Sequence, residues 1–153
     1  VTVYFLRAFA KRELKDYKGA IEDCNKAIEL DPEFYDVYNE RGDAKYYLKD
    51  YNGAIADYTK AIELDPNQTN SNFNLAGAYH NRGSTKNDLE DHYGAIEDLN
   101  AAIELNPNLA SAYNSRSIAK ENIGFYYGAC DDAKKAANLG HTNAAKWFAE
   151  NCN

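Results

Sequence analysis

The stretch that decides the fold is Asp50–Pro66, which reads DYNGAIADYTKAIELDP. An earlier stretch, Asp16–Pro32, is identical to it at 13 of 17 positions, and Asp91–Pro107 is a third copy. A weaker fourth copy covers Tyr126–Leu139. The alanines of the four Gly-Ala pairs lie 34, 41 and 34 residues apart. Self-similarity at such a period predicts an architecture built from repeated units.

Each unit contains two helices according to its apolar pattern. In the second copy Ala54, Tyr58 and Ala61 recur at three- and four-residue steps, as they do on one face of a helix. Pro66 ends this helix, because proline has no N–H and its ring clashes with the preceding turn. The segment Tyr35–Lys49 has a helical pattern of its own. The unit is therefore a first helix (A), a short turn, a second helix (B) and a proline turn.

This pattern resembles the tetratricopeptide repeat, a helical hairpin of 34 residues. The residues that carry the likeness in the second copy are Tyr38, Gly42, Ala54, Tyr58, Ala61 and Pro66. The corresponding sets are Tyr4, Ala8, Ala20, Cys24, Ala27 and Pro32; Asn72, Ala76, Ala95, Leu99, Ala102 and Pro107; and Tyr113, Ser117, Ala129, Ala133 and Ala136. The resemblance covers nearly the whole chain. It implies an all-α, right-handed solenoid of four hairpins with a C-terminal capping helix.

The expected organisation is a single domain, residues 1–153, with a third repeat that is seven residues longer than the others. The expected boundaries are 1–34, 35–68, 69–109 and 110–141, with the capping helix at 142–151. Within the long repeat, Gly83-Ser84-Thr85 has the pattern of a helix stop followed by a new cap. We therefore expect a lengthened turn between its two helices. In that register Leu75 and Tyr79 take the places of Arg41 and Lys45.

Charged residues recur at equivalent places in the other repeats. Arg41 on helix A is expected to face Asp57 on helix B of the same hairpin, because the two helices are antiparallel. The same pairing is expected for Arg7 with Asp23 and for Arg116 with Asp132. A half-buried pair of this kind fixes geometry more than it adds stability, because desolvation offsets the attraction. Its predicted role is structural.

The three cysteines are Cys24, Cys130 and Cys152, and no CxxC or CxxH spacing occurs. The sequence therefore predicts no metal site and no cofactor. Cys24 is expected to be a buried small side chain. Cys130 and Cys152 lie on either side of the turn at Gly140, so an antiparallel hairpin would bring them together. The hypothesis is a disulfide, which would imply a periplasmic or secreted protein; without it, a cytoplasmic location is the default.

The formal net charge is −7, and the chain has no long apolar run. A negative chain disfavours nucleic acid, whose binding needs clustered Lys and Arg, and no membrane insertion is expected. No phosphate loop, nucleophile elbow or zinc-protease motif is present, so no enzymatic activity is predicted. The chain begins at Val1 inside the first repeat, and we interpret it as an excised domain or a processed product.

The resemblance implies that the A helices line a concave groove that binds a partner protein. The expected groove residues are Phe5, Phe9, Asp36, Asn39, Asp43, Tyr46, Tyr47, Phe73, Asn74, His80 and Asn114. Ser115 and Ile118 lie on the same predicted face as Asn114. Relatives that grip acidic chaperone tails carry Lys and Arg where this chain has Phe5, Phe9, Asn39 and Asp43, so such a tail is not expected. The acidic residues favour a basic partner segment.

Two other functions stay open at this level. The chain could be an architectural module that spaces domains or self-associates through its first helix, where Phe5 and Phe9 are large aromatics. It could also be an accessory domain of a larger enzyme. Trp147 is expected to anchor the capping helix, with a ligand-stacking role as the alternative reading.

Overall fold

The computed structural model describes residues 1–64 and 72–152, and in this part of the chain all regular structure is α-helical. The chain divides into two compact units, Val1–Gln68 and Thr69–Asn153. The helices of the first unit are α1 (Thr2–Glu13), α2 (Tyr17–Leu30), α3 (Tyr35–Tyr47) and α4 (Tyr51–Leu64). Those of the second are α5 (Asn72–Asp88), α6 (His92–Leu105), α7 (Ala110–Asn122), α8 (Tyr126–Asn138) and α9 (Thr142–Asn151). The prediction of an all-α helical repeat is confirmed.

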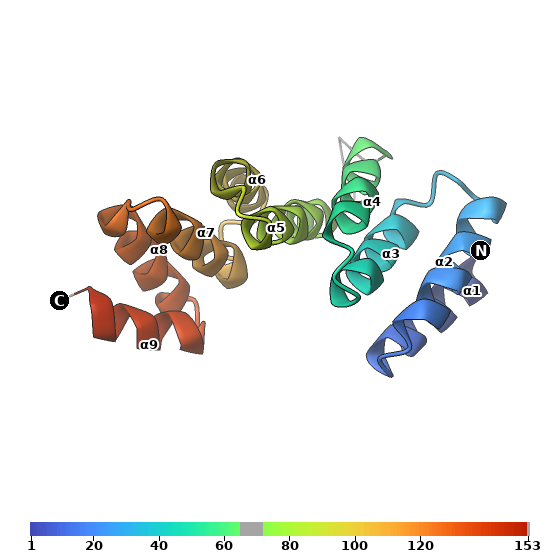
Figure 1. Ribbon diagram of the computed structural model, residues 1–153, viewed down its shortest axis with the longest axis horizontal. Helices are drawn as coiled ribbons and strands as arrows, with labels where there is room; N and C mark the ends of the chain where they lie inside the picture. The colour runs from blue at the N-terminus through green and yellow to red at the C-terminus, as the bar shows by residue number, and fades with distance from the viewer. Residues whose placement is uncertain (65–71, 153) are drawn as a thin grey trace. The chain divides into compact units, whose positions relative to one another are not determined.

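Consecutive helices form antiparallel hairpins, α1–α2 and α3–α4 in the first unit and α5–α6 and α7–α8 in the second (Figure 1). Two residues after the end of each A helix, the turn contains a residue with positive φ, namely Lys15, Lys49, Glu90 and Gly124. In the first three hairpins an aspartate follows and caps the B helix: Asp16 accepts a hydrogen bond of 3.0 Å from the backbone N–H of Gly19. Asp50 and Asp91 cap α4 and α6 in the same way. Each of these three turns thus satisfies a backbone donor at the start of its B helix.

The expected lengthened turn in the third repeat is wrong. Helix α5 runs without interruption through Gly83, Ser84 and Thr85, and the turn after it has the same length as the others and a positive-φ residue at the same place. Gly83 is no helix stop: a Cβ there would lie 3.0 Å from Leu99 Cγ, so the missing side chain lets α6 approach closely. Thr85 Oγ1 donates to the carbonyl of Asn81 instead of capping a new helix.

The extra residues of the long repeat therefore precede Ala76. As a result the equivalents of Arg41 and Lys45 are Arg82 and Lys86, not Leu75 and Tyr79. The side chains of Phe73 and Asn74 lie outside the described residues.

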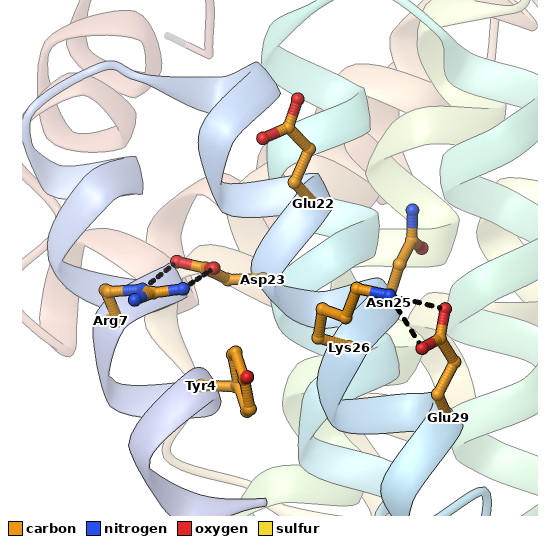
Figure 2. A pocket seen from close by; sticks show the side chains of 7 residues that line it. All are labelled: Tyr4, Arg7, Glu22, Asp23, Asn25, Lys26 and Glu29. Carbon is orange, nitrogen blue, oxygen red and sulfur yellow. Dashed lines mark hydrogen bonds and ion pairs between the residues drawn. The ribbon is translucent and has the colours of Figure 1, made fainter.

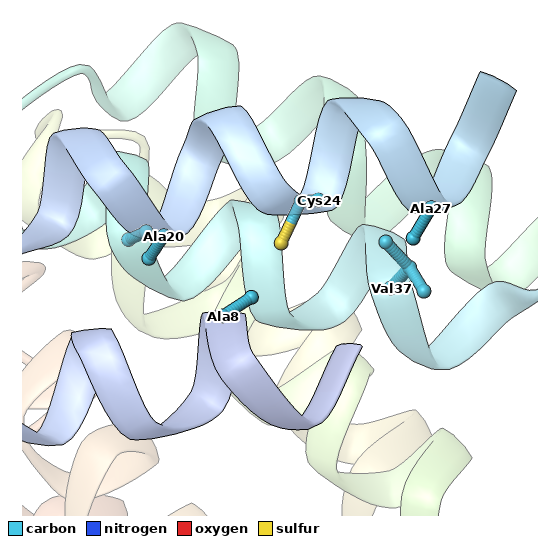
Figure 3. Close-up of a cluster of buried hydrophobic side chains, with 6 residues drawn as sticks. Ala8, Ala20, Cys24, Ala27 and Val37 are labelled. Atoms are coloured by element: carbon cyan, nitrogen blue, oxygen red, sulfur yellow. The ribbon is translucent and has the colours of Figure 1, made fainter. Parts of the chain in front are cut away.

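Small side chains fill the space between the hairpins. In the first unit the fully buried cluster consists of Ala8, Ala20, Cys24, Ala27, Val37 and Ala44 (Figure 3). In the second unit a corresponding cluster consists of Ala95, Leu99, Ala102, Ala112 and Ala119. Alanine stripes allow the backbones to approach closely, and close packing provides the dispersion energy of the core. Cys24 is the free, buried cysteine in this part of the chain, and burial raises its pKa to about 12.

Helix α9 packs on α8 at the end of the second unit. Its first turn is capped by His141, whose Nδ1 accepts a hydrogen bond of 3.2 Å from the backbone N–H of Ala144. A disulfide joins Cys130 on α8 to Cys152 just beyond α9, with 5.7 Å between the two Cα atoms. The bond ties the last helix covalently to the hairpin that it covers. None of the helices in the described part of the chain has the length and apolar character of a membrane span.

Candidate functional site

An Arg–Asp–Lys cluster holds the two helices of every hairpin together. In α3–α4 the guanidinium of Arg41 donates from Nε and Nη2 to the two carboxylate oxygens of Asp57, at 2.9 and 2.6 Å. Lys45 Nζ lies 2.8 Å from the same carboxylate. The equivalent clusters are Arg7, Lys11 and Asp23; Arg82, Lys86 and Asp98; and Arg116, Lys120 and Asp132. The charged side chains of each cluster are paired with one another inside their own hairpin.

The A-helix face of the first unit is also largely paired within the chain. Arg12 on α1 donates to Glu40 on α3 at 2.6 Å, and both side chains are largely buried. Burial raises the pKa of Glu40, although the charge of Arg12 opposes that shift. Asp43 accepts a hydrogen bond of 2.8 Å from the hydroxyl of Tyr58, a residue whose pKa burial raises. The expected groove residue Asp43 is thus engaged inside its own hairpin.

The aromatic groove residues of the first unit do not gather on one surface. Phe5 packs on Phe34 at the edge of the core, with 5.3 Å between the ring centroids. Phe9 is half exposed under the guanidinium of Arg12. Tyr46 and Tyr47 lie at the end of α3 with two other tyrosines, and Tyr47 stacks on Tyr17 at 5.0 Å.

Two further expected residues lie on α3 itself. Asp36 is in the first turn of the helix, where a negative charge is favourable. The side-chain oxygen of Asn39 is buried and has no hydrogen-bond partner among the described residues. Tyr47 lines a pocket of about 200 Å³ together with Arg12, Glu13, Lys15 and Tyr17, and none of the other expected groove residues is part of it.

A polar cluster joins α5 and α7 in the second unit. His80 Nε2 lies 3.3 Å from the hydroxyl oxygen of Ser115 and 3.4 Å from that of Ser84, while Nδ1 lies 3.1 Å from the side-chain oxygen of Asn81. Ser84 in turn donates to Ser115 at 3.0 Å. Burial lowers the pKa of His80, because the imidazolium would lose its hydration. The ring is therefore favoured in its neutral form.

A pocket opens in the same unit, between α7, α8 and α9. Its volume is about 240 Å³. The lining residues are Asn114, Ser117, Ile118, Ala133, Asn143, Ala144 and Trp147. Apolar side chains form most of the wall, and the two asparagines each offer a carboxamide that can both donate and accept. Such a combination suits an apolar side chain that is attached to a peptide backbone.

Asn114 and Ile118 are the pocket residues that the sequence places on the predicted groove face. Trp147 is predicted from the sequence to anchor the capping helix. The apolar pattern of a terminal helix does not distinguish a side chain that fills the core from one that lines a pocket. The sequence pattern did not indicate that Asn143 lines a pocket, since this depends on how α9 docks. Among the described residues no group of three or more His, Cys, Asp and Glu side chains is arranged to hold a metal ion.

Comparison with known proteins agrees with this architecture. Tetratricopeptide repeat models match residues 1–34 and 76–109, and a TPR repeat model matches residues 42–83. The match that begins at residue 76 agrees with the register of α5, which places the extra residues before Ala76. A search of curated protein sequences found no significant match.

Several solved structures have the same fold. The crystal structure of MamA is 23% identical, with a TM-score of 0.77, and the alignment covers 93% of this chain and 90% of that one. A chain in the crystal structure of the APC/C hetero-tetramer Cut9–Hcn1 is 17% identical with a TM-score of 0.89, and the alignment covers 98% of this chain but 29% of the other.

The first TPR of Spaghetti (RPAP3), solved with the HSP90 peptide SRMEEVD, is 25% identical with a TM-score of 0.68, covering 76% of this chain and 88% of that one. The repeat models, the hairpin geometry and these neighbours lead to one conclusion. The chain belongs to the tetratricopeptide repeat family.

Proposed function

We propose that this protein is a protein-interaction scaffold whose second unit binds a segment of a partner protein. The observation that carries the proposal is the pocket between α7, α8 and α9. The solved neighbour that binds a peptide supports the general role, because it shares the fold at 25% identity.

The pocket has the size and chemistry for one aliphatic side chain of the partner. Ile118 is 42% exposed, and Trp147 forms part of the same wall. Burying a side chain of the size of Leu or Ile contributes about 1.5–3 kcal/mol. Asn114 and Asn143 can then bond to the backbone N–H and C=O groups on either side of the anchor, whatever the sequence there. The partner segment is therefore expected to be defined by an apolar anchor.

The charges favour a partner segment that is neutral or basic outside its anchor. The net charge of −7 repels acidic segments. The cations on the A-helix side of the first unit, Lys11 and Arg12, are paired with Asp23 and Glu40. They are not free to grip an acidic tail, such as the glutamates and aspartate of the peptide in the Spaghetti structure.

A peptide library displayed on phage tests this proposal. It is selected on wild type, on Ile118→Glu and on Leu89→Glu. Leu89 is a matched control, because it lies in the same unit and is 41% exposed, almost the same as Ile118, but is not part of the pocket. All three proteins must first show the same helicity and melting temperature.

We expect peptides with one recurring apolar residue to be enriched on wild type and on Leu89→Glu. A charge in the pocket should reduce their binding by about tenfold or more on Ile118→Glu, because the anchor would then meet a carboxylate. Absence of enrichment on wild type, or equal binding to all three proteins, would refute the pocket as the binding site.

A further inference from the structure

We propose that the disulfide between Cys130 and Cys152 controls binding at the pocket between α7, α8 and α9. With the bond formed, α9 stays docked and the pocket is complete. Reduction of the bond by a thiol or dithiol compound releases α9 and abolishes binding. This regulation rests on the function proposed above, because it concerns the same pocket.

Helix α9 supplies a substantial part of that pocket. Asn143, Ala144 and Trp147 come from α9, and the other lining residues belong to α7 and α8. When α9 leaves, the indole and one of the two carboxamides leave with it. The exposed side chain of Ile118 on α7 then has no wall beside it from α9. A docked α9 is therefore a condition for the binding site.

The side of α9 that faces the hairpin is only partly packed. All ten residues of α9 are described, and Ala144 is the buried one among them, in a small cluster with Tyr113 and Ala136. Trp147 is partly exposed and lines the pocket, so open space interrupts this contact. An isolated helix needs about 12–15 residues to be even marginally stable in water. Packing alone therefore holds α9 weakly.

Arginine side chains link the helices of the hairpins. Figure 2 shows such a link within a hairpin, where Arg7 reaches from α1 to Asp23 on α2. Between hairpins, Arg41 Nη1 on α3 donates at 2.7 Å to the side-chain oxygen of Asn25 on α2. Arg116 links α7 to α6 in the same way, also at 2.7 Å. In both places a guanidinium ties a helix back to the hairpin that precedes it.

Helix α9 has no such donor. Its sequence, TNAAKWFAEN, contains no arginine, and the disulfide just beyond its last residue joins it to α8 instead. At its other end the turn contains Gly140, with a φ of +92°. A Cβ on Gly140 would meet nothing within 4 Å among the described residues, so the backbone has room to change conformation there. Breaking the disulfide therefore leaves a short helix attached through a flexible turn.

A reductant can reach the bond, because Cys130 and Cys152 are both partly exposed. A thiolate of the reductant attacks one sulfur atom, the bond between the two cysteines breaks, and one cysteine leaves as a thiolate while the other forms a mixed disulfide. A second thiol of the reductant then attacks the mixed disulfide. The reductant loses two electrons and becomes a disulfide, and its two protons end on the cysteines.

Cys24 takes no part in this exchange. It is fully buried in the first unit, and burial raises its pKa to about 12. Since the thiolate is the form that attacks a disulfide, Cys24 does not compete for either partner. Reoxidation therefore restores the bond between Cys130 and Cys152.

Hydrogen exchange followed by mass spectrometry tests the release of α9 without any ligand. The oxidised chain is compared with the chain reduced by dithiothreitol. The control is the double variant with Cys130→Ser and Cys152→Ser, in which the reductant has no bond to break. On reduction we expect the amides of α9 to exchange about tenfold faster or more, because the segment is no longer held at both ends. The amides of α8 should change less, and the double variant should not respond to dithiothreitol.

Two results of this measurement would overturn the proposal. One is unchanged exchange in α9 after reduction. The other is an equal rise in α7, α8 and α9, because the bond would then stabilise the unit as a whole rather than the docking of α9.

A peptide selected on the oxidised chain tests the consequence for binding, with fluorescence anisotropy as the readout. We expect its Kd to rise about tenfold or more on reduction, because the apolar anchor loses the wall formed by α9. Affinity should return when dithiothreitol is removed and oxidised glutathione re-forms the bond.

The two proposals fail in different ways. Equal affinity in both redox states, with the loss on Ile118→Glu retained, would overturn the regulation and leave the proposed function intact. If no peptide is enriched on the oxidised chain, the proposed function is refuted, and the regulation with it.

Discussion

The outer faces of α1 and α8 differ in what covers them among the described residues. Each lies at the side of a hairpin where a further helix can pack. Helix α9 covers α8 and a disulfide fastens it there, whereas the outer face of α1 exposes Val3, Leu6 and Leu14. The comparison shows that a hairpin has an apolar face at its side, and that this face becomes part of the core where another helix covers it.

The helix that covers α8 also contributes to a pocket. Trp147 and Asn143 come from α9 and complete a pocket with Asn114 and Ile118 of α7. In the second unit the covering helix is thus part of a candidate binding site.

The largest effect is expected from removing the aspartate of an Arg–Asp–Lys cluster, and it should be larger in the second hairpin than in the first. Asp57→Ala leaves Arg41 and Lys45 half buried without their carboxylate, which should lower the free energy of unfolding by about 4 kcal/mol. Asp23→Ala should cost clearly less, because Arg7 is exposed and can turn to water. Urea unfolding of both variants measures the difference, and equal losses would show that the position of the hairpin does not matter.

Opening the disulfide tests the covered end. Removal of the bond by the pair Cys130→Ser and Cys152→Ser should destabilise the second unit by about 3 kcal/mol, the entropy of a loop closed over a sequence separation of 22 residues. Thermal unfolding with and without reductant measures the same effect on wild type. If the melting temperature of the second unit is unchanged, α9 is held by packing alone.

A methyl group added at a close contact between helices should destabilise the first unit more than the second. A Cβ at Gly42 would lie 2.6 Å from Tyr58 Cε1, and that ring is fixed by burial and by its bond to Asp43. Gly42→Ala should therefore cost about 2–3 kcal/mol, and Gly83→Ala, where Leu99 Cγ lies at 3.0 Å, about 1 kcal/mol. The reverse order in chemical denaturation would contradict the packing described here.

A smaller effect on stability is expected when the pH is lowered, because His80 in the second unit has a lowered pKa. His80 has a lowered pKa in the folded chain, so the unfolded chain takes up its proton first as the pH falls. The contribution of His80 to stability is complete above its ordinary pKa of 6.5 and decreases as the pH drops below that value toward the folded pKa. Unfolding of wild type and His80→Gln between pH 7.5 and 5 should converge at low pH, and parallel curves would refute this role.

The fold and the family could be predicted from the sequence, because the repeated Gly-Ala pairs and prolines constrain each hairpin locally. The recurrence of Arg41 and Asp57 at equivalent places was enough to propose their pairing. The place of the extra residues was not predictable in this way. Gly83-Ser84-Thr85 looks like a helix end, and only its packing against Leu99 shows that glycine serves close approach instead.

The candidate sites depended on information that the sequence does not carry. Asp43 has the composition of a groove residue, but Tyr58 binds it from the neighbouring helix. Trp147 has the composition of a core residue, but the docking of α9 leaves it at the wall of a pocket. In both cases the outcome is decided by contacts between helices, which a pattern within one helix does not reveal.

The indole signal of Trp147 offers the most direct test of the central claim, since this is the single tryptophan of the chain. A peptide selected on the wild-type protein is titrated into the ¹⁵N-labelled chain, and the indole N–H cross-peak is followed by NMR. We predict that this peak and the side-chain amides of Asn114 and Asn143 shift saturably, with the affinity that fluorescence anisotropy gives for the same selected peptide. A peptide that binds at that affinity while the indole peak stays in place would contradict a binding site between α7, α8 and α9.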